Sequence, residues 1–378
     1  MKGTIRHLFP GGNTSQGFYS YYHYILSQED ANKIICIKGG PGTGKSSMMK
    51  KIGEYFNSNG YNIEYHHCSS DNNSLDGVLI PALKVAILDA TAPHIVDPKN
   101  PGAVDEVLNL SDCWDEKKLR NNKSEIISIN NAIGNTFKRA YKYIEAAKII
   151  HDGWSNLNLE AMDFSKLNML KEKLKEELFK NKVSTLGKER HLFATAFTPN
   201  GIVTYIDNLQ ENYKNIYVLN GEPGTCKSNI LSFLGNEAIK RGHYVEIFHK
   251  PLIPQEIEHV LIPDLNVALL TSNEINKKEF SGTQIYTNEL QKENILNKNL
   301  TKIQDEKETF YLLLDKGLEI ISGAKTLHDQ LEAYYIPAMD FTKVNEKYKK
   351  VLNNFLEYES KNTVDNAFKQ IKNDIFFV

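Results

Sequence analysis

Several features are scarce in this chain, and each shortage narrows the classes of protein it can be. Arginine is rare, with five residues against 40 lysines, which weakens functions that depend on clustered arginines. The four cysteines show no CxxC spacing, so we expect reduced thiols and no disulfide framework. No apolar run approaches the roughly 18 residues that span a bilayer, and residues 1–6 lack a signal-peptide pattern. Reduced thiols without such segments make a cytoplasmic protein the expectation. The net charge of −2 gives no nucleic-acid or membrane signal.

One short segment carries the strongest functional signal. Residues 39–46, GGPGTGKS, match the phosphate-binding pattern of a glycine, four residues and then Gly-Lys-Ser. The strand-like residues 34–37 precede them and the helix-like residues 47–56 follow. Glycines let backbone N–H groups converge on phosphate oxygens, and the helix N-terminus adds positive charge. The pattern predicts that Lys45 reaches the β- and γ-phosphates of ATP and that Ser46 ligates Mg²⁺.

A second Mg²⁺ ligand is expected at the end of an apolar strand. Residues 85–88 form an apolar run suited to a buried parallel strand, and Asp89 follows directly. The catalytic base is less defined, because Ala90 stands where many ATPases of this broad class have a glutamate. Asp76 joins Lys45 and Asp89 in the predicted catalytic set. The other acidic or basic alternatives left open are Glu64, Glu246, Glu258 and His94.

The chain repeats itself at long range. Residues 221–228, GEPGTCKS, reproduce the loop 182 positions later. Similar shifts align RHLF at 6–9 with 190–193, VLIP at 78–81 with 260–263, and AMDF at 161–164 with 338–341. So long a period indicates tandem domains, which we place at residues 1–182 and 183–378. Each is predicted to be an α/β domain of the P-loop NTPase type, a mainly parallel sheet flanked by helices, with additional long helices.

Local patterns supply further expectations. The predicted strands are 34–37, 62–67 and 85–88, and the predicted helices are 46–57, 123–152, 166–180 and the 301–335 region. Residues 75–83 are expected to form a short connection, 92–110 an irregular loop and 181–188 the linker. Asp163 is predicted to cap the helix after it. Arg6 and Arg190 either reach across as arginine fingers or anchor their own domains.

The second copy of the loop has lost two important residues. Cys226 replaces Gly44 and adds a side chain beside the phosphate position, while Thr271 replaces Asp89. We therefore expect an active first site and a second site that is weakened, regulatory or structural. The predicted nucleotide-binding residues are Gly39, Gly40, Pro41, Gly42, Thr43, Gly44, Lys45, Ser46 and Ser47 in the first copy, and Gly221, Gly224, Thr225, Cys226, Lys227 and Ser228 in the second.

The combined motifs resemble a known but poorly characterised family. They are GGPGTGKSS, VLIPALKVAILDATAPH and the paired AMDF segments. Together they resemble tandem P-loop ATP-binding proteins, mostly of low-GC Gram-positive, often spore-forming bacteria. The resemblance covers nearly the whole chain and supplies no substrate. The chain departs from an intact double site at Cys226 and Thr271, so the resemblance does not imply two working sites.

Three functions stay open at this stage. An ATPase that couples hydrolysis to domain movement ranks first, because two related domains can clamp and release. A nucleotide-dependent sensor with little turnover ranks second, favoured by Ala90 and Cys226. A nucleotide or small-molecule kinase ranks third, because Arg120 is the one arginine in the expected lid region. The expected partner is a nucleoside triphosphate, and an unidentified protein partner remains open.

Overall fold

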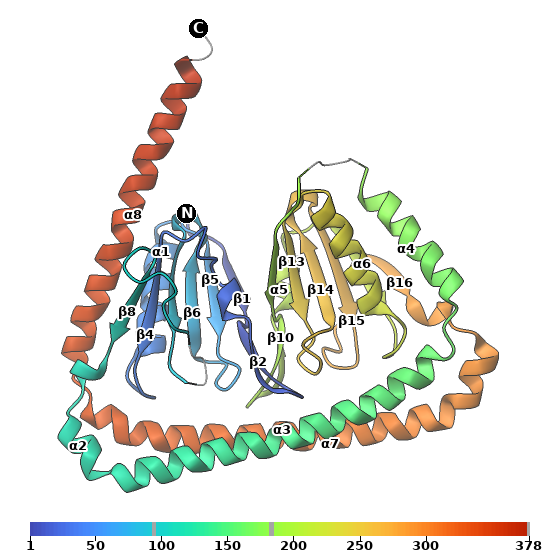
Figure 1. The fold of residues 1–378 in the computed structure, drawn as a ribbon, viewed down its shortest axis with the longest axis horizontal. Helices are drawn as coiled ribbons and strands as arrows, with labels where there is room; N and C mark the ends of the chain where they lie inside the picture. Colours follow the sequence, from blue (N-terminus) through green and yellow to red (C-terminus); the bar gives the residue numbers. More distant parts are fainter. Residues whose placement is uncertain (93–95, 181–184, 376–378) are drawn as a thin grey trace.

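The chain folds into an α/β structure in which two sheets stand side by side over a pair of long helices (Figure 1). The computed structural model describes residues 1–92, 96–180 and 185–375, and for residues 360–375 the backbone alone. The predicted linker at 181–188 therefore lies partly outside the described residues.

The strands of the two halves follow the same order along the chain. The first half holds β1 (Ile5–Leu8), β2 (Gly11–Thr14), β3 (Gly17–Ser20), β4 (Lys33–Lys38), α1 (Lys45–Ser58), β5 (Ile63–His67), β6 (Leu75–Ile80), β7 (Val85–Asp89), β8 (Asp105–Asn109), α2 (Glu116–Asn121), α3 (Lys123–Leu159) and α4 (Phe164–Leu178). The second half holds β9 (Glu189–Leu192), β10 (Thr195–Thr198), β11 (Gly201–Thr204), α5 (Ile206–Gln210), β12 (Asn215–Asn220), α6 (Lys227–Lys240), β13 (Val245–His249), β14 (Ile257–Ile262), β15 (Val267–Ser272), β16 (Thr283–Tyr286), α7 (Glu293–Tyr335) and α8 (Phe341–Ile375). Among the helices, α1, α3 and α4 correspond to α6, α7 and α8.

The two six-stranded sheets correspond strand by strand. Their orders are β1-β5-β6-β7-β4-β8 and, read in the same sense, β9-β13-β14-β15-β12-β16. In the first sheet β6 runs antiparallel to both neighbours, while the pairs β1–β5, β4–β7 and β4–β8 are parallel. The sheets are therefore mixed, with one reversed strand in an otherwise parallel arrangement.

Two segment predictions need correction. Residues 75–83 are not a plain connection, because β6 fills most of them and every residue of that strand is buried. Residues 92–110 are not wholly irregular, because β8 pairs with β4 as the edge of the sheet. Polar residues or glycine interrupt the apolar run in both segments, so the sequence pattern did not indicate a strand. They are Asp76 and Gly77 in the first segment and Asp105 and Glu106 in the second.

A small central sheet joins the halves. The hairpins β2–β3 and β10–β11 meet through Asn13 and Phe197 and form the four-stranded sheet β11-β10-β2-β3. Phe9 and Phe193 exchange backbone hydrogen bonds across the same junction at 3.0 Å each. Both phenylalanine rings are fully buried, so the junction has its own small core.

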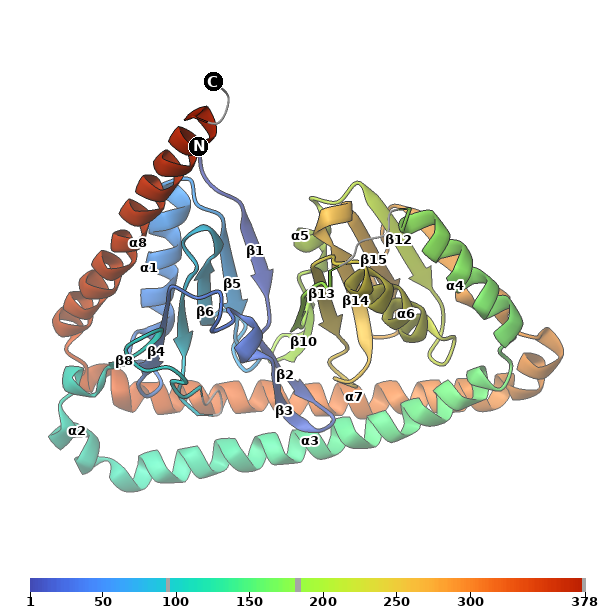
Figure 2. The same cartoon turned by 45° about the horizontal axis from the view of Figure 1, so that its top comes forward.

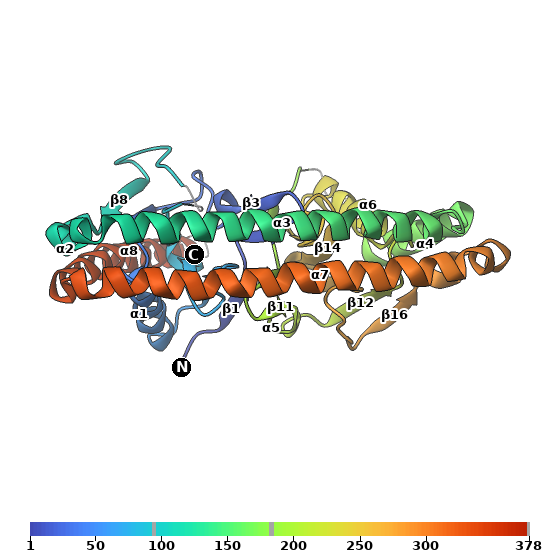
Figure 3. The same ribbon diagram turned by 90° about the horizontal axis from the view of Figure 1, so that it is seen from below.

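The long helices pack against each other along their length. Buried residues of α3 fall at positions 140, 144, 147, 151, 154 and 158, alternating steps of four and three, and those of α7 include 310, 314, 317, 321, 324 and 331. This is the spacing of a coiled-coil seam. Seen from below, α3 and α7 lie side by side and run in opposite directions under both sheets (Figure 3). A helix of 37 residues spans about 55 Å, so α3 carries the chain from one half to the other.

The helices after these long spans are exchanged between the halves. Leu167 and Leu174 of α4 join the core of the second sheet, where α6 also packs. Val344, Val351 and Phe355 of α8 join the core of the first sheet. Figures 1 and 2 show α4 flanking the second sheet and α8 flanking the first. The predicted boundary at 182/183 thus separates the sequence repeats, whereas each packed body takes its last helix from the other repeat.

No helix in the described ranges is both long enough and apolar enough to cross a membrane.

Candidate functional site

The first glycine-rich loop, residues 39–46 and here called loop 1, joins the end of β4 to the start of α1. Gly42 and Gly44 have φ values of 65° and 90°, a region that glycine enters without steric cost. The Lys45 ammonium folds back over the loop and donates to the Gly39 and Gly40 carbonyls at 2.8 and 2.7 Å. The loop therefore wraps around a lysine at a helix N-terminus, an arrangement suited to anions.

The predicted carboxylate lies beside this lysine. Asp89 ends β7, which pairs with β4 so that Asp89 is the register partner of Ile37 just before loop 1. Its Oδ2 lies 3.5 Å from Lys45 Nζ, and its Oδ1 accepts a hydrogen bond from the Thr91 N–H at 2.9 Å. The structure thus brings Lys45 and Asp89 together at the carboxyl ends of two neighbouring parallel strands, where ligands of α/β sheets commonly bind.

The predicted hydroxyl ligand follows on the first turn of α1. Ser46 Oγ accepts a hydrogen bond from the Leu75 N–H at 3.0 Å, which ties loop 1 to the start of β6. A hydroxyl oxygen, which has a second lone pair beside the one used here, and a carboxylate are ligands of the kind that Mg²⁺ takes. Ser46 and Asp89 fit that ion on chemical grounds.

The predicted base Asp76 is a buried residue of β6 with a phenolic partner. It is 4 % exposed and accepts a hydrogen bond from the Tyr22 hydroxyl at 2.5 Å. Burial and the neighbouring Asp76 charge raise the pKa of Tyr22 well above its usual value, so the phenol keeps its proton. Asp76 as the base remains a prediction, and His94 lies outside the described residues.

The matching residue of the second half, Glu258, is also held by side chains. It accepts hydrogen bonds from Asn273 and Asn276 at 3.0 and 2.9 Å. Burial raises the pKa of Glu258 to about 6. The position therefore carries a sequestered acid in both halves.

The remaining acidic alternatives form an ion cluster between the halves. Arg6 binds Glu64 at 2.7 Å and Glu246 at 2.6 Å, and Arg190 binds Glu64 at 2.7 Å and Glu246 at 3.4 Å. Burial raises the pKa of Glu64, but the Arg190 and Arg6 charges outweigh it and hold that pKa well below the usual range. Both arginines reach the opposite half, as the arginine-finger alternative required, but their guanidinium groups form ion pairs with carboxylates. Glu64 and Glu246 serve as the anions of this cluster.

The second glycine-rich loop, residues 221–228 and here called loop 2, keeps the backbone path of the first. Cys226 has a φ of 64°, at the position where Gly44 has 90°. A non-glycine residue pays about 1–2 kcal/mol for this left-handed conformation. Thr271, at the Asp89 position, is fully buried and donates its hydroxyl proton to the Glu258 carbonyl at 2.9 Å. Loop 2 therefore keeps the shape of loop 1 at a cost in strain and without its carboxylate.

The lysine of loop 2 sits in a different electrostatic setting. Lys227 donates to the Gly221 carbonyl and, at 2.8 Å, to the Glu222 carbonyl. Burial lowers its pKa to about 8, although the nearby Glu274 charge opposes the shift. Glu274 itself pairs with His151 Nε2 of α3 at 2.8 Å. Sequence reasoning missed Glu274 because it follows the Asp89 position by three residues and matches Ala92.

Each loop is covered by the long helix of the other repeat. At loop 1, the Gly42 N–H donates to Glu332 Oε1 of α7 at 3.1 Å. A Cβ placed on Gly40 would lie 2.6 Å from the Tyr335 ring, so α7 rests directly on the loop. Glu332 was not found from the sequence, since its match under the 177-residue shift is Ser155.

Loop 2 is covered in the same way by α3. Asn158 Nδ2 donates to the Pro223 carbonyl at 2.9 Å. A Cβ on Gly224 would lie 1.9 Å from the Ser155 carbonyl oxygen. Both glycine-rich loops are thus closed by residues from the opposite half of the sequence.

The repeated segments around residues 151 and 161 lie at these contacts. Asp163 accepts hydrogen bonds from the Ser165 and Lys166 amides at 3.0 and 3.3 Å and caps α4 as predicted. Asp340 caps α8 in the same way through the two amides that follow it.

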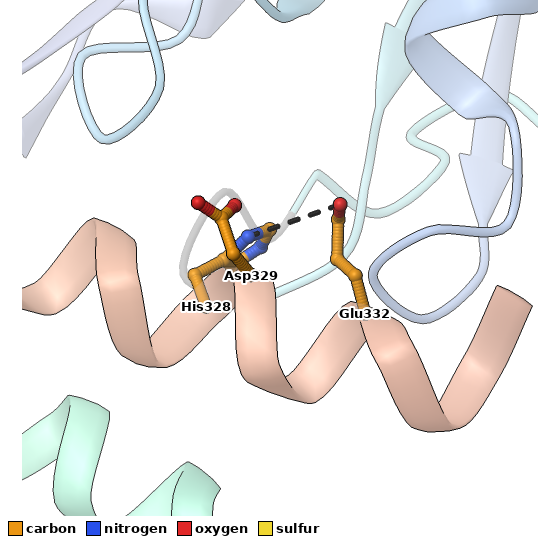
Figure 4. Close-up of side chains that lie close together, drawn as sticks. All are labelled: His328, Asp329 and Glu332. Atoms are coloured by element: carbon orange, nitrogen blue, oxygen red, sulfur yellow. Dashed lines mark ion pairs between the residues drawn. The ribbon is translucent and has the colours of Figure 1, made fainter.

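A cluster of possible metal ligands lies on α7. His328, Asp329 and Glu332 have ligand atoms within 4.8 Å of one another, and His328 Nδ1 lies 3.8 Å from Glu332 Oε1 (Figure 4). Asp329 is exposed and the other two side chains are partly buried, and exposed acidic groups commonly cluster without a metal.

One family model matches the chain. The N-terminal domain of nephrocystin 3 matches residues 18–133, a segment that includes loop 1 and β4 to β8 and covers less than a third of the chain. Loop 2 lies outside the match. No curated protein and no solved structure matches the sequence.

Proposed function

We propose that the protein binds Mg-ATP at loop 1 and hydrolyses it, and that loop 2 is a weakened or regulatory copy of the same site. The observation that carries this proposal is the convergence of Lys45, Asp89 and a glycine loop with positive φ angles at the ends of β4 and β7. Each of these features also occurs in proteins for purely structural reasons, but their combination at the carboxyl ends of two neighbouring strands fits triphosphate binding.

The residues of loop 1 suit the two components of Mg-ATP. The backbone N–H groups of residues 42–46 would bind phosphate oxygens, and Lys45 would exchange its two carbonyl partners for the phosphates. Ser46 and Asp89 would hold Mg²⁺, which neutralises phosphate charge when bound. The resemblance to tandem P-loop ATP-binding proteins, based on the motifs of both halves, agrees with this assignment.

Three differences support a weaker loop 2. Cys226 places a side chain where the loop is already strained, and Thr271 offers no carboxylate. Lys227 has a pKa near 8 and is therefore less firmly cationic at neutral pH than an ordinary lysine. Each change reduces attraction for a magnesium-bound triphosphate.

A nucleotide-dependent sensor with little turnover is the second candidate. It is favoured by the contacts of α7, which touches loop 1 through Glu332 and loop 2 through the Lys307–Glu222 pair at 3.3 Å. A helix that contacts both loops offers a route by which occupancy of one affects the other.

Phosphate release from Mg-ATP by the full chain tests the proposal, with Lys45→Ala and the matched Lys227→Ala as variants. We expect steady release that Lys45→Ala abolishes and Lys227→Ala reduces much less. If the parent binds ATP through Lys45 without release, the sensor replaces the ATPase. Equal loss of tight Mg-ATP binding in both variants would refute the inequality of the loops.

A further inference from the structure

Loop 1 already has an anion on one of its amides, and that anion belongs to the other half of the chain. The Gly42 N–H points at Glu332 Oε1, 290 positions later, at 3.1 Å. The contact with the end of α7 is close, since a Cβ on Gly42 would lie 2.9 Å from Ile336 and 3.3 Å from the Glu332 Cβ. A carboxylate on this amide makes the same charge-assisted bond that a phosphate oxygen would make.

The carboxylate and a phosphate compete for this amide, because it has one proton to donate and two anions beside it repel each other. Glu332 can release its hydrogen bond to the Gly42 amide. Its side chain is 32 % exposed, and its Oε1 lies 3.8 Å from Nδ1 of His328 on the same helix. A rotation of the side chain frees the amide while the α7 backbone stays over the loop, through the Tyr335 and Ile336 contacts.

The other carboxylates considered for this site are held by other partners. Asp76 accepts from Tyr22, Glu64 binds two arginines, and Asp89 faces Lys45. Ala90 leaves the position after Asp89 without an acid. Among these groups, Glu332 is the carboxylate that accepts a hydrogen bond from a backbone amide of loop 1.

We propose that Glu332 is the acidic residue of the first nucleotide site, supplied in trans by the second repeat. This inference rests on the proposed function. In the structure Glu332 accepts the hydrogen bond of the Gly42 amide. When phosphate takes that amide, the displaced carboxylate stays within reach of the phosphates and accepts the proton of the attacking water. The water oxygen bonds to the terminal phosphorus, the bond to the bridging oxygen breaks, and ADP and phosphate form.

Replacement of Glu332 by phosphate on the Gly42 amide also links the two loops through α7. The same helix carries Tyr335 over Gly40 and Lys307 beside Glu222 of loop 2. Nucleotide arriving at loop 1 must therefore move a side chain of the helix that also borders loop 2.

Glu332→Gln tests this assignment, with Glu319→Gln as the matched control. Glutamine keeps the size and one acceptor oxygen, so the fold and the Gly42 contact are retained without the charge. Glu319 lies on the same helix, is 70 % exposed and forms an ion pair with Lys316. Two readouts are taken on the full chain: equilibrium binding of a non-hydrolysable Mg-ATP analogue, and phosphate release from Mg-ATP.

We expect Glu332→Gln to bind the analogue about five- to tenfold more tightly, since the neutral amide competes less well for Gly42. We expect phosphate release to fall by about a hundredfold or more, the usual effect of removing a general base. Release and binding equal to those of Glu319→Gln would overturn the proposal, and so would unchanged release with tighter binding.

The binding arm separates this proposal from the ATPase proposal. If the parent binds the analogue through Lys45 but releases no phosphate, hydrolysis by this chain is refuted on its own. In that case tighter binding by Glu332→Gln would support the competition of Glu332 for the Gly42 amide and refute only its role as the base, whereas binding equal to that of the parent would refute both.

Discussion

Removal of Arg6 from the buried ion cluster gives the most direct test of how the two halves are held together. Arg6 makes three of the charged hydrogen bonds there, to Glu64 at 2.7 Å and to Glu246 at 3.0 and 2.6 Å. The two glutamate side chains are only 4 % and 3 % exposed. Arg6→Met would leave Glu246 with Arg190 at 3.4 Å as its remaining cation in the cluster.

The expected cost follows from that geometry. Removing one partner of a buried pair costs about 3–5 kcal/mol, mainly because the remaining charge stays buried without compensation. Arg6 is 25 % exposed, so water can partly replace it, and we place the loss at the low end, about 3 kcal/mol. Urea-induced unfolding of the full chain measures this loss as a change in the free energy of unfolding.

Two further variants make the result interpretable. Arg6→Met combined with Glu246→Gln removes cation and anion together, so the double variant should be more stable than the sum of the single losses predicts, by about 1 kcal/mol or more. Lys188→Met breaks an exposed pair with Asp30 at 3.2 Å and should cost less than about 1 kcal/mol. A loss below about 1 kcal/mol for Arg6→Met, or strict additivity in the double variant, would refute the reasoning.

Two other predictions concern the loop cover and the histidines of the junction. Gly224→Ala should lower the free energy of unfolding in urea by about 2–4 kcal/mol, because its Cβ would lie 1.9 Å from the Ser155 carbonyl oxygen. The control Gly102→Ala has the same φ of 80° and no atom within 4 Å of the new Cβ, so it should cost about 1 kcal/mol. Equal losses would argue against the packing of α3 on loop 2. Burial and the neighbouring His7 lower the pKa of His67 to about 4, so its neutral form stabilises the fold above pH 6.5 and this contribution is lost as the pH falls from 6.5 toward 4. Between pH 7 and pH 5 we expect about 1–2 kcal/mol less stability from this group, and a His67→Gln variant that showed the same pH dependence as the parent would contradict the assignment.

Much of the local structure could be predicted from short-range patterns. The strand before loop 1, the helix after it and the strand ending at Asp89 all appear within one or two residues of their predicted bounds. The cap at Asp163 was also correct. Such features depend on neighbouring residues and on backbone preferences, which a sequence shows directly. The strands β6 and β8 were missed because polar residues interrupt their apolar runs, and pairing in the sheet outweighs that local signal.

The residues of the candidate site also divide into those that local sequence patterns predict and those that only the fold brings together. Lys45, Ser46 and Asp89 could be proposed from spacing alone, because a loop and the strand beside it obey local rules. Glu332 could not, since it is 290 positions from Gly42 and its counterpart in the other repeat is a serine. Only the fold shows that Glu64 and Glu246 belong to the ion cluster with Arg6 and Arg190.

The sequence by itself determined the repeated α/β units, the two glycine-rich loops and the inequality between them at Cys226 and Thr271. The tertiary structure alone decided which sheet each helix covers. An amphipathic pattern shows that a helix has an apolar face but not which surface buries it. Because α3 and α7 are long enough to cross beneath both sheets, the chain delivers α4 to the second core and α8 to the first, and each loop is closed by residues from the opposite repeat.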